Sequence, residues 1–233
     1  MDDLILGIVW YVVFVFSLTC HEAAHAWAAM RGGDLTAYHG GQVSLDPIPH
    51  IRREPFGTVL VPIFVFVLNG WMFGWASTPY DPSWAHAHPR RAAVMSLAGP
   101  AANLALVLLA VAAIRGGAAL GHFVAPESVN FTTITAAAQP GVGDAVATFL
   151  SLLFTMNLLL CVFNLIPVPP LDGSGAIGLL VQEDTARRIQ EWMQQPALAW
   201  GGILVAWLLI PRIFGPVFLT AVNWLYPGVS YGS

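Results

Sequence analysis

The sequence predicts an all-α protein with several membrane-spanning helices, and three observations support that prediction. Hydrophobic residues make up 57% of the 233 residues and charged residues only 9%, with no lysine among them. The mean hydropathy is +0.68, whereas a soluble domain needs far more polar surface. Several apolar stretches also reach the roughly 20 residues that cross a bilayer: 4–30, 56–76, 92–114, 145–166 and 197–225. We expect one integral-membrane domain over 1–233, with its core at about 4–182 and further membrane segments at about 197–226.

The first apolar stretch, 4–30, is expected to be a retained helix. Only three residues precede it and two of them are acidic, so it lacks the positive start of a signal peptide. His21, Glu22 and His25 interrupt its apolar run. Ionisable groups inside a bilayer are costly and usually mark a functional site shielded from lipid.

The second stretch, 56–76, is not expected to cross the membrane once. The positive-inside rule prefers arginine-rich loops in the cytoplasm, and seven of the nine arginines can lie there together only if 56–76 turns back. Glycine and proline within this stretch ease helix breaks where protein covers the backbone, which favours a re-entrant or membrane-lying segment. The stretches 4–30 and 145–166 then both end on the cytoplasmic side. The seven arginines are Arg31, Arg52, Arg53, Arg90, Arg91, Arg187 and Arg188.

The remaining elements follow from the same patterns. The stretches 92–114 and 145–166 each suit one span, and the Gly-, Pro- and Thr-containing segment 116–144 between them suits an external loop. The last stretch contains Pro211 and Pro216, so we expect two short passes turning at Pro211–Arg212, with one kinked span as the alternative. Residues 36–45, with Gly40–Gly41 at the centre, are typical of a small β-hairpin. Cys20 and Cys161 are interpreted as packing residues.

His21 and His25 form a His-x-x-x-His pattern that is typical of a metal site. Residues four apart project from the same face of a helix, so both imidazoles can bind one ion while Glu22 reaches a water beside it. A catalytic zinc needs three protein ligands and one open position. The best third ligand is Asp172, which follows a proline-broken apolar segment at the end of 145–166. A role for Asp172 as a helix N-cap is the alternative.

Three motifs together resemble the site-2 protease family of intramembrane metalloproteases. They are His21-Glu22-Ala23-Ala24-His25, Ala98-Gly99-Pro100-Ala101-Ala102-Asn103, and the stretch from Asn164 to Gly173, which matches Asn-x-x-Pro-x-x-x-Leu-Asp-Gly. A further stretch resembles the compact branch of this family, which lacks a PDZ domain: Gly41-Gln42-Val43-Ser44-Leu45-Asp46-Pro47, followed by His50-Ile51 and Phe56-Gly57-Thr58. The resemblance covers residues 21–173 and implies a single Zn²⁺ held by His21, His25 and Asp172. It implies that Glu22 is the catalytic base and that Asn164 lies near bound substrate.

The predicted activity is hydrolysis of peptide bonds in or beside transmembrane segments. Zn²⁺ would polarise the scissile carbonyl while Glu22 takes a proton from the attacking water. An extended substrate could pair with the free edge of the predicted hairpin, which makes Gln42 and Val43 candidate substrate-binding residues. Asn103 is interpreted as a helix-packing residue and His50 as a surface residue.

The expected partners are single-span membrane proteins and the lipid bilayer. The expected location is a bacterial or archaeal cell membrane, with the active site open towards the cytoplasm. No basic run suggests nucleic acid. Two other classes of function stay open, namely an integral-membrane diiron hydroxylase or desaturase and a metal transporter or inactive scaffold. The hydroxylase needs several His boxes where this chain has one His-x-x-x-His, and the transporter needs polar groups along several helices.

Overall fold

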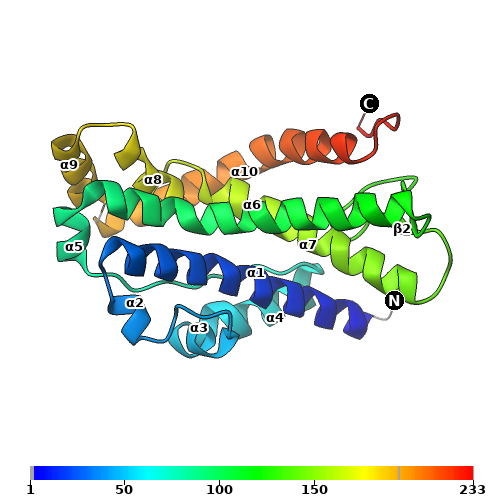
Figure 1. Cartoon of the computed structure of the whole chain (residues 1–233), viewed down its shortest axis with the longest axis horizontal. Coiled ribbons are helices and arrows are strands. Elements are labelled where there is room, and N and C mark those ends of the chain that lie inside the picture. Colours follow the sequence, from blue (N-terminus) through cyan, green and yellow to red (C-terminus); the bar gives the residue numbers. More distant parts are fainter. Residues whose placement is uncertain (1–2, 194, 233) are drawn as a thin grey trace.

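The computed structural model describes residues 3–193 and 195–232, and four long helices dominate it (Figure 1). Length and composition make all four suitable for crossing a membrane, which confirms the predicted all-α membrane fold. The elements in chain order are α1 (Asp3–Gly32), α2 (Thr36–His39), α3 (Pro47–Arg53), the π-helical η1 (Phe56–Leu60), α4 (Val61–Asn69), α5 (Pro82–Ala87), α6 (Pro89–Ala119), β1 (Phe123–Val124), β2 (Ala136–Ala137), α7 (Val142–Asn164), α8 (Asp172–Ala176), the 3₁₀-helical η2 (Ile177–Leu179), α9 (Glu183–Met193) and α10 (Pro196–Leu225).

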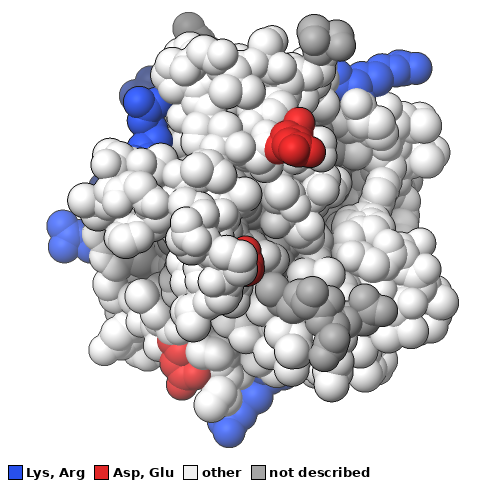
Figure 2. All heavy atoms as spheres, turned by 90° about the vertical axis from the view of Figure 1, so that its right-hand side faces the viewer, with Lys and Arg blue, Asp and Glu red and all other residues white. Residues whose placement is uncertain are grey.

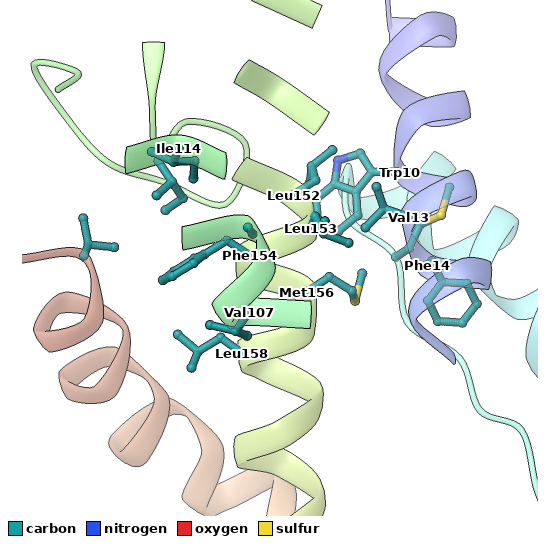
Figure 3. Packing of buried hydrophobic residues seen from close by; sticks show 14 of the residues in the cluster. Trp10, Val13, Phe14, Val107, Ile114, Leu152, Leu153, Phe154, Met156 and Leu158 are labelled. Atoms are coloured by element: carbon teal, nitrogen blue, oxygen red, sulfur yellow. The ribbon is translucent and has the colours of Figure 1, made fainter. Parts of the chain in front are cut away.

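Helices α1, α6 and α7 form the three-helix core. Helix α6 packs against both α1 and α7, and α10 packs against α7. The shared core consists of apolar side chains from these helices, including Trp10, Phe14, Val107 and Phe154 (Figure 3). Many large apolar side chains elsewhere on the long helices are exposed, such as Leu204 on α10 at 62%. Exposed apolar faces of this kind suit contact with lipid.

The segment between α3 and α5 doubles back on itself, as predicted for 56–76. Helix α4 ends at Gly70, whose φ of +73° is left-handed and suits glycine. The chain then returns without helix or strand, and Trp75 N donates to Gly57 O at 3.1 Å. Arg53 and Glu54 both contact the Ser77 hydroxyl, so the two ends of the segment lie together. The prediction that 56–76 turns back is therefore confirmed.

The predicted β-hairpin at 36–45 is wrong. Asp34 accepts hydrogen bonds from the backbone N–H and the hydroxyl of Thr36 and thereby starts helix α2. Gly41, at φ +72°, ends that turn, with Gln42 N donating to Ala37 O. The same Gly-Gly pair that suits a hairpin turn also suits the end of a helix. The small antiparallel sheet lies instead in the predicted external loop, where Phe123 pairs with Ala137 and Val124 with Ala136.

The prediction of two short C-terminal passes is also wrong, because α10 is one continuous helix. Pro211 and Pro216 both lie inside it. Each proline removes one backbone donor, but helices in apolar surroundings tolerate this where neighbouring groups satisfy the freed carbonyls. Near its end Arg115 Nη1 donates to the carbonyls of Trp224 and Leu225, so α10 finishes beside the end of α6.

The end of the molecule that carries the small sheet bears few charges, and its surface in Figure 2 is mostly uncharged with isolated acidic and basic side chains. At the opposite end, Arg91 donates to Gly32 O and Arg187 to His86 O. Arginines that are distant in the sequence thus gather where α1 ends and α6 begins. The predicted path of the chain through the membrane depends on this uneven distribution of arginines between the two ends.

Candidate metal centre and active site

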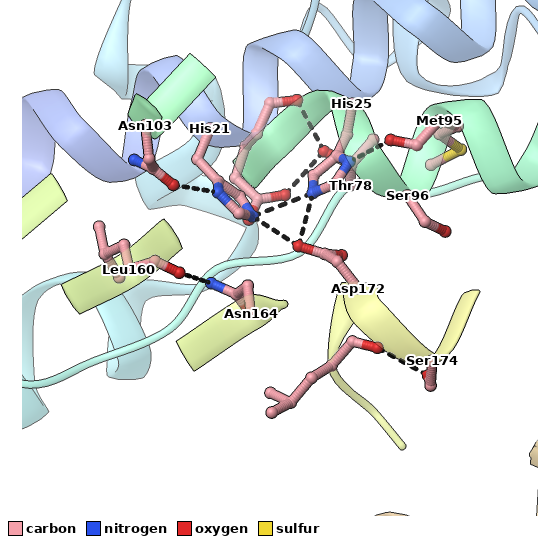
Figure 4. A network of polar contacts seen from close by, with 12 residues as sticks. His21, His25, Thr78, Met95, Ser96, Asn103, Leu160, Asn164, Asp172 and Ser174 are labelled. Carbon is pink, nitrogen blue, oxygen red and sulfur yellow. Dashed lines mark hydrogen bonds and ion pairs between the residues drawn. The ribbon is translucent and has the colours of Figure 1, made fainter. Parts of the chain in front are cut away.

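Helix α1 places His21 and His25 one turn apart with their rings edge to face. The ring centroids are 4.6 Å apart and the two Nε2 atoms 2.9 Å apart. Both side chains are buried, as is Glu22. Figure 4 shows the two rings converging between α1 and the neighbouring helix. The i, i+4 spacing on a continuous helix produces this convergence.

Gly99 on α6 makes room for the two rings. A Cβ atom at this position would lie 2.5 Å from Nε2 and Cε1 of His21, and closer still to Nε2 of His25. Any other residue would therefore occupy the space where the imidazoles meet. Gly99 was part of a motif recognised in the sequence, but its contact with both rings follows only from how α6 packs on α1.

The Nδ1 atoms of the two histidines face oxygen atoms on α6. His25 Nδ1 lies 2.7 Å from Met95 O, and His21 Nδ1 lies 2.6 Å from Asn103 Oδ1. A carbonyl oxygen only accepts hydrogen bonds, so His25 donates through Nδ1–H and its Nε2 carries the lone pair. This is the tautomer that a metal ligand needs, with the second ring nitrogen held by a hydrogen bond.

Asp172 reaches the same point from the segment after α7. The prolines between Ile166 and Leu171 break the helix, and α8 restarts at Asp172. Asp172 Oδ2 lies 3.1 Å from His21 Nε2 and 3.3 Å from His25 Nε2. Leu171, not Asp172, occupies the N-cap position and no side chain caps α8, so the alternative of a capping role is wrong.

These three side chains fit a zinc ion. They are the one His/Cys/Asp/Glu group of metal-binding geometry in the described part of the chain. Ligands about 2.0–2.1 Å from a tetrahedral zinc stand roughly 3.3 Å from one another, and the three ligand atoms here are 2.9, 3.1 and 3.3 Å apart. Asp172 Oδ2 is buried and accepts no hydrogen bond from the described residues. Lone pairs of two neutral imidazoles and a carboxylate at this distance repel unless a cation joins them.

Glu22 is held beside this cluster by Thr78. The Thr78 hydroxyl lies 2.7 Å from Glu22 Oε2 and 2.9 Å from Glu22 O. Thr78 belongs to the irregular segment that returns from Gly70 to α5, so a residue 56 positions away orients the carboxylate. Thr78 lies in no periodic pattern of the sequence, and its contact with Glu22 was not predicted.

The other predicted site residues take different places. Asn164 lies near the cluster in Figure 4, half-buried, and its Nδ2 donates to Leu160 O at 3.0 Å. Gln42 is buried and its amide donates to Ser77 O at 3.3 Å, while Val43 is half-buried. The hairpin edge that motivated these two residues is not formed, so their contact with substrate stays a prediction.

Two further interpretations need correction. His50 is buried, at 2% exposure, with Nε2 3.1 Å from Ser44 O, because α3 folds back over the preceding loop. It is not a surface residue. Asn103 does more than pack helices, because its side chain contacts a metal-site histidine directly. Cys20 and Cys161 are both free, as predicted.

Comparison with known proteins agrees with this geometry. The profile of peptidase family M50 matches residues 9–209. The chain belongs to peptidase family M50. It is 36% identical over 171 residues to a putative zinc metalloprotease, YwhC, of Bacillus subtilis, covering 73% of this chain and 68% of that protein. It is 29% and 31% identical to putative zinc metalloproteases named Rip2 from Mycolicibacterium smegmatis and Mycobacterium tuberculosis, covering 93% and 94% of this chain and 73% of each relative. No solved structure gives a significant match.

Membership of family M50 decides between the classes of function that the sequence left open. The chain is a zinc metallopeptidase and a hydrolase of the site-2 protease type, as predicted, and zinc is its cofactor. The diiron hydroxylase and the transporter or scaffold are set aside. The family and the four apolar helices together make it an integral membrane protein of bacterial type.

Proposed function

We propose that this M50 peptidase hydrolyses peptide bonds in or next to the transmembrane segment of single-span membrane proteins. The observation that carries the proposal is the convergence of His21, His25 and Asp172 at one point between apolar helices, with Glu22 buried beside it. When bound there, zinc supplies a Lewis acid for the scissile carbonyl and lowers the pKa of the attacking water.

Glu22 is proposed as the general base and then the general acid. Its Oε2 is 2.7 Å from the Thr78 hydroxyl, and within the described residues Oε1 takes no hydrogen bond. Oε1 is therefore free to accept the proton of the water and later to deliver it to the leaving amine. A carboxylate that is buried and held at one oxygen needs little reorganisation for this transfer.

Asn164 is proposed to bind the substrate. Its amide uses one N–H for Leu160 O, and its second N–H is available to a carbonyl oxygen of the substrate. The side chain is half-buried, so a substrate entering near Asp172 can reach it. In this position the amide would help to hold the oxyanion that forms during hydrolysis.

The active site is proposed to open towards the cytoplasm. Helix α1 runs without a break from His21 to Gly32, and the ten residues from His21 to Arg31 span about 15 Å at ~1.5 Å per residue. The site thus lies below the membrane surface at the end where the arginines gather. The positive-inside rule assigns that end to the cytoplasm.

Glu22→Gln separates catalysis from metal binding. We expect purified Glu22→Gln to retain about one zinc per chain and to lose cleavage of a panel of single-span substrates, because the amide cannot take a proton. His21→Gln serves as the control and should lose both zinc and cleavage. Zinc content is measured by mass spectrometry and cleavage by gel analysis in lipid vesicles. Retained cleavage in Glu22→Gln would contradict the proposed mechanism, and two irons per chain in the wild-type protein would contradict the assignment of the metal as zinc.

A further inference from the structure

A chain of buried amides connects His21 to helix α7. Asn103 Nδ2 lies 2.8 Å from Asn157 Oδ1, and Asn157 Nδ2 lies 2.8 Å from both Ser17 Oγ and Leu153 O. Ser17, Asn103 and Asn157 are all 0% exposed. They come from α1, α6 and α7, so the three core helices meet in one polar cluster directly behind the metal-site histidine.

The direction of each hydrogen bond between these amides follows from one main-chain atom, Leu153 O. Leu153 O only accepts, so Asn157 must turn its Nδ2 towards it and its Oδ1 towards Asn103. Asn103 must then turn its own Nδ2 towards Asn157. Ser17 O, 3.5 Å from the same Nδ2, is also an acceptor and favours the same orientation.

This orientation decides which nitrogen of His21 carries a hydrogen. With its Nδ2 engaged by Asn157, Asn103 presents Oδ1 to His21 Nδ1 at 2.6 Å. His21 must donate through Nδ1–H, and Nε2 keeps its lone pair facing Asp172 and His25. His25 reaches the same tautomer directly, through Met95 O. His21 has a side-chain amide as its partner, and an amide can present either an oxygen or an NH₂ group.

Simple helix packing does not require this arrangement. Three polar side chains in an apolar core cost free energy unless each is satisfied, and apolar residues of the same size would fill the space without that cost. The amides instead fix the direction of the hydrogen bonds, because the contact with Asn157 prevents Asn103 from exchanging the positions of its oxygen and its NH₂ group. A hydrogen-bonded partner on the far side of a ligating histidine typically changes metal affinity by about 10- to 100-fold.

We propose that Asn157 is a positioning residue that fixes the zinc-binding tautomer of His21 by locking the amide of Asn103. It touches no atom of the metal cluster and acts through Asn103 alone. The inference depends on the proposed role of His21 as a zinc ligand. It extends the site across the width of the three-helix core, to a residue of α7.

The test compares zinc affinity in Asn157→Leu and in the double variant Asn103→Asp with Asn157→Leu. Affinity is measured by competition with a chelator on full-length protein in lipid nanodiscs. Asn157→Leu should weaken zinc binding about 10- to 100-fold, because only the long 3.5 Å contact with Ser17 O would then keep the Asn103 NH₂ group from turning towards His21. Both oxygens of an aspartate accept, so Asn103→Asp needs no help from position 157 and should restore most of the lost affinity.

Controls separate this inference from packing and from the proposed function. Thr155→Val changes another buried residue of α7, whose hydroxyl has no partner within the described residues, and should leave zinc affinity unchanged. Thermal unfolding without zinc shows whether each variant folds. His21→Gln tests the ligand assignment by itself, and full zinc affinity in that variant would overturn the proposed function.

Two results would overturn the positioning role while leaving the ligand assignment intact. One is a folded Asn157→Leu variant with wild-type zinc affinity, and the other is failure of Asn103→Asp to restore it. If Asn157→Leu does not fold, Asn157→Ala replaces it in both comparisons. Nitrogen-15 resonance of the zinc-loaded wild type gives an independent check, because the His21 signals, identified by their loss in His21→Gln, must show a hydrogen on Nδ1. A metal-bound Nδ1 overturns the inference.

Discussion

Replacing Gly99 with alanine is the sharpest test of how helix packing creates the proposed zinc site. The new methyl carbon would lie 2.5 Å from His21 Nε2, whereas an ordinary van der Waals contact begins at 3.4 Å. The ring or the helix must therefore move by the difference, 0.9 Å, to restore an ordinary contact. Zinc–ligand distances vary by only about 0.2 Å, so a displacement of this size removes at least one ligand from its position.

The surroundings prevent the rings from moving freely. Each Nδ1 is tied to α6, His25 to Met95 O and His21 to Asn103 Oδ1, so displacement of a ring also breaks a hydrogen bond. We expect Gly99→Ala to weaken zinc binding by at least about 100-fold, which corresponds to about 2.7 kcal/mol. Over-packing between α1 and α6 should lower the stability of the fold by only about 1–3 kcal/mol, which leaves a folded protein without its metal.

Gly116→Ala on the same helix is the matched control. Beyond its own helix backbone, no atom of the described residues lies within 4 Å of a Cβ atom at position 116. This variant should therefore bind zinc as wild type does and be slightly more stable, because alanine favours helix over glycine by about 1 kcal/mol. Zinc affinity is measured by chelator competition and stability by thermal unfolding in nanodiscs. A Gly99→Ala variant with wild-type zinc affinity would refute the reasoning, because it would mean that the two rings do not meet at Gly99.

Two further predictions concern the segment that returns from Gly70. Thr78→Val removes the hydroxyl that holds Glu22 Oε2 at 2.7 Å. We expect the rate of cleavage to fall by about 10-fold or more, because a displaced proton-transfer group loses part of its contribution to the rate, while zinc content stays the same. An unchanged cleavage rate would argue against the contact. The second prediction concerns Asp34, which accepts hydrogen bonds from Thr36 and, at 2.9 Å, from Asp81 N. Burial raises the pKa of Asp34, but these hydrogen bonds lower it below the ordinary value of 3.8. A lowered pKa means that the stabilisation is fully present above pH 3.8 and is lost as pH falls through the folded-state value, so thermal stability should drop on acidification below about pH 4. Asp34→Asn should be less stable at pH 7 by about 1–3 kcal/mol, because its NH₂ group faces a backbone N–H, and it should lack this acid-dependent component; equal melting curves at pH 7 would contradict this.

Much of the metal site could be predicted from the sequence because its parts depend on short-range rules. The four-residue spacing of His21 and His25 needs only a continuous helix to bring the rings together. Asp172 was recognisable because an acid after a proline-broken apolar segment needs a cation. The distribution of arginines predicted that 56–76 doubles back, and the hydrogen bond between Trp75 and Gly57 shows that it does.

The features that were missed depend on tertiary contacts or on ambiguous turn chemistry. Gly40–Gly41 is compatible with a hairpin turn and with the end of a helix, and the hydrogen bonds of Asp34 favour the helix. Thr78 lies in a segment with no periodicity, so nothing in the sequence connected it with Glu22. Asn103 was visible as a polar residue in an apolar helix, but which helix it faces is decided by packing.

The proposed zinc ligands and the proposed catalytic base are held by different kinds of structure, and this has an expected functional consequence. His21 and His25 are fixed by hydrogen bonds from the long helix α6, whereas Glu22 is held by Thr78 on an irregular segment. Rigid helices keep a metal site in place when substrate enters, while an irregular segment can adjust more easily because fewer backbone hydrogen bonds hold it. Zinc affinity should therefore be insensitive to changes between Gly70 and Asp81, and the rate of hydrolysis should be sensitive to them. A substrate that displaces this segment would alter the orientation of Glu22 directly, so we expect control of hydrolysis to lie at the proposed base and not at the metal.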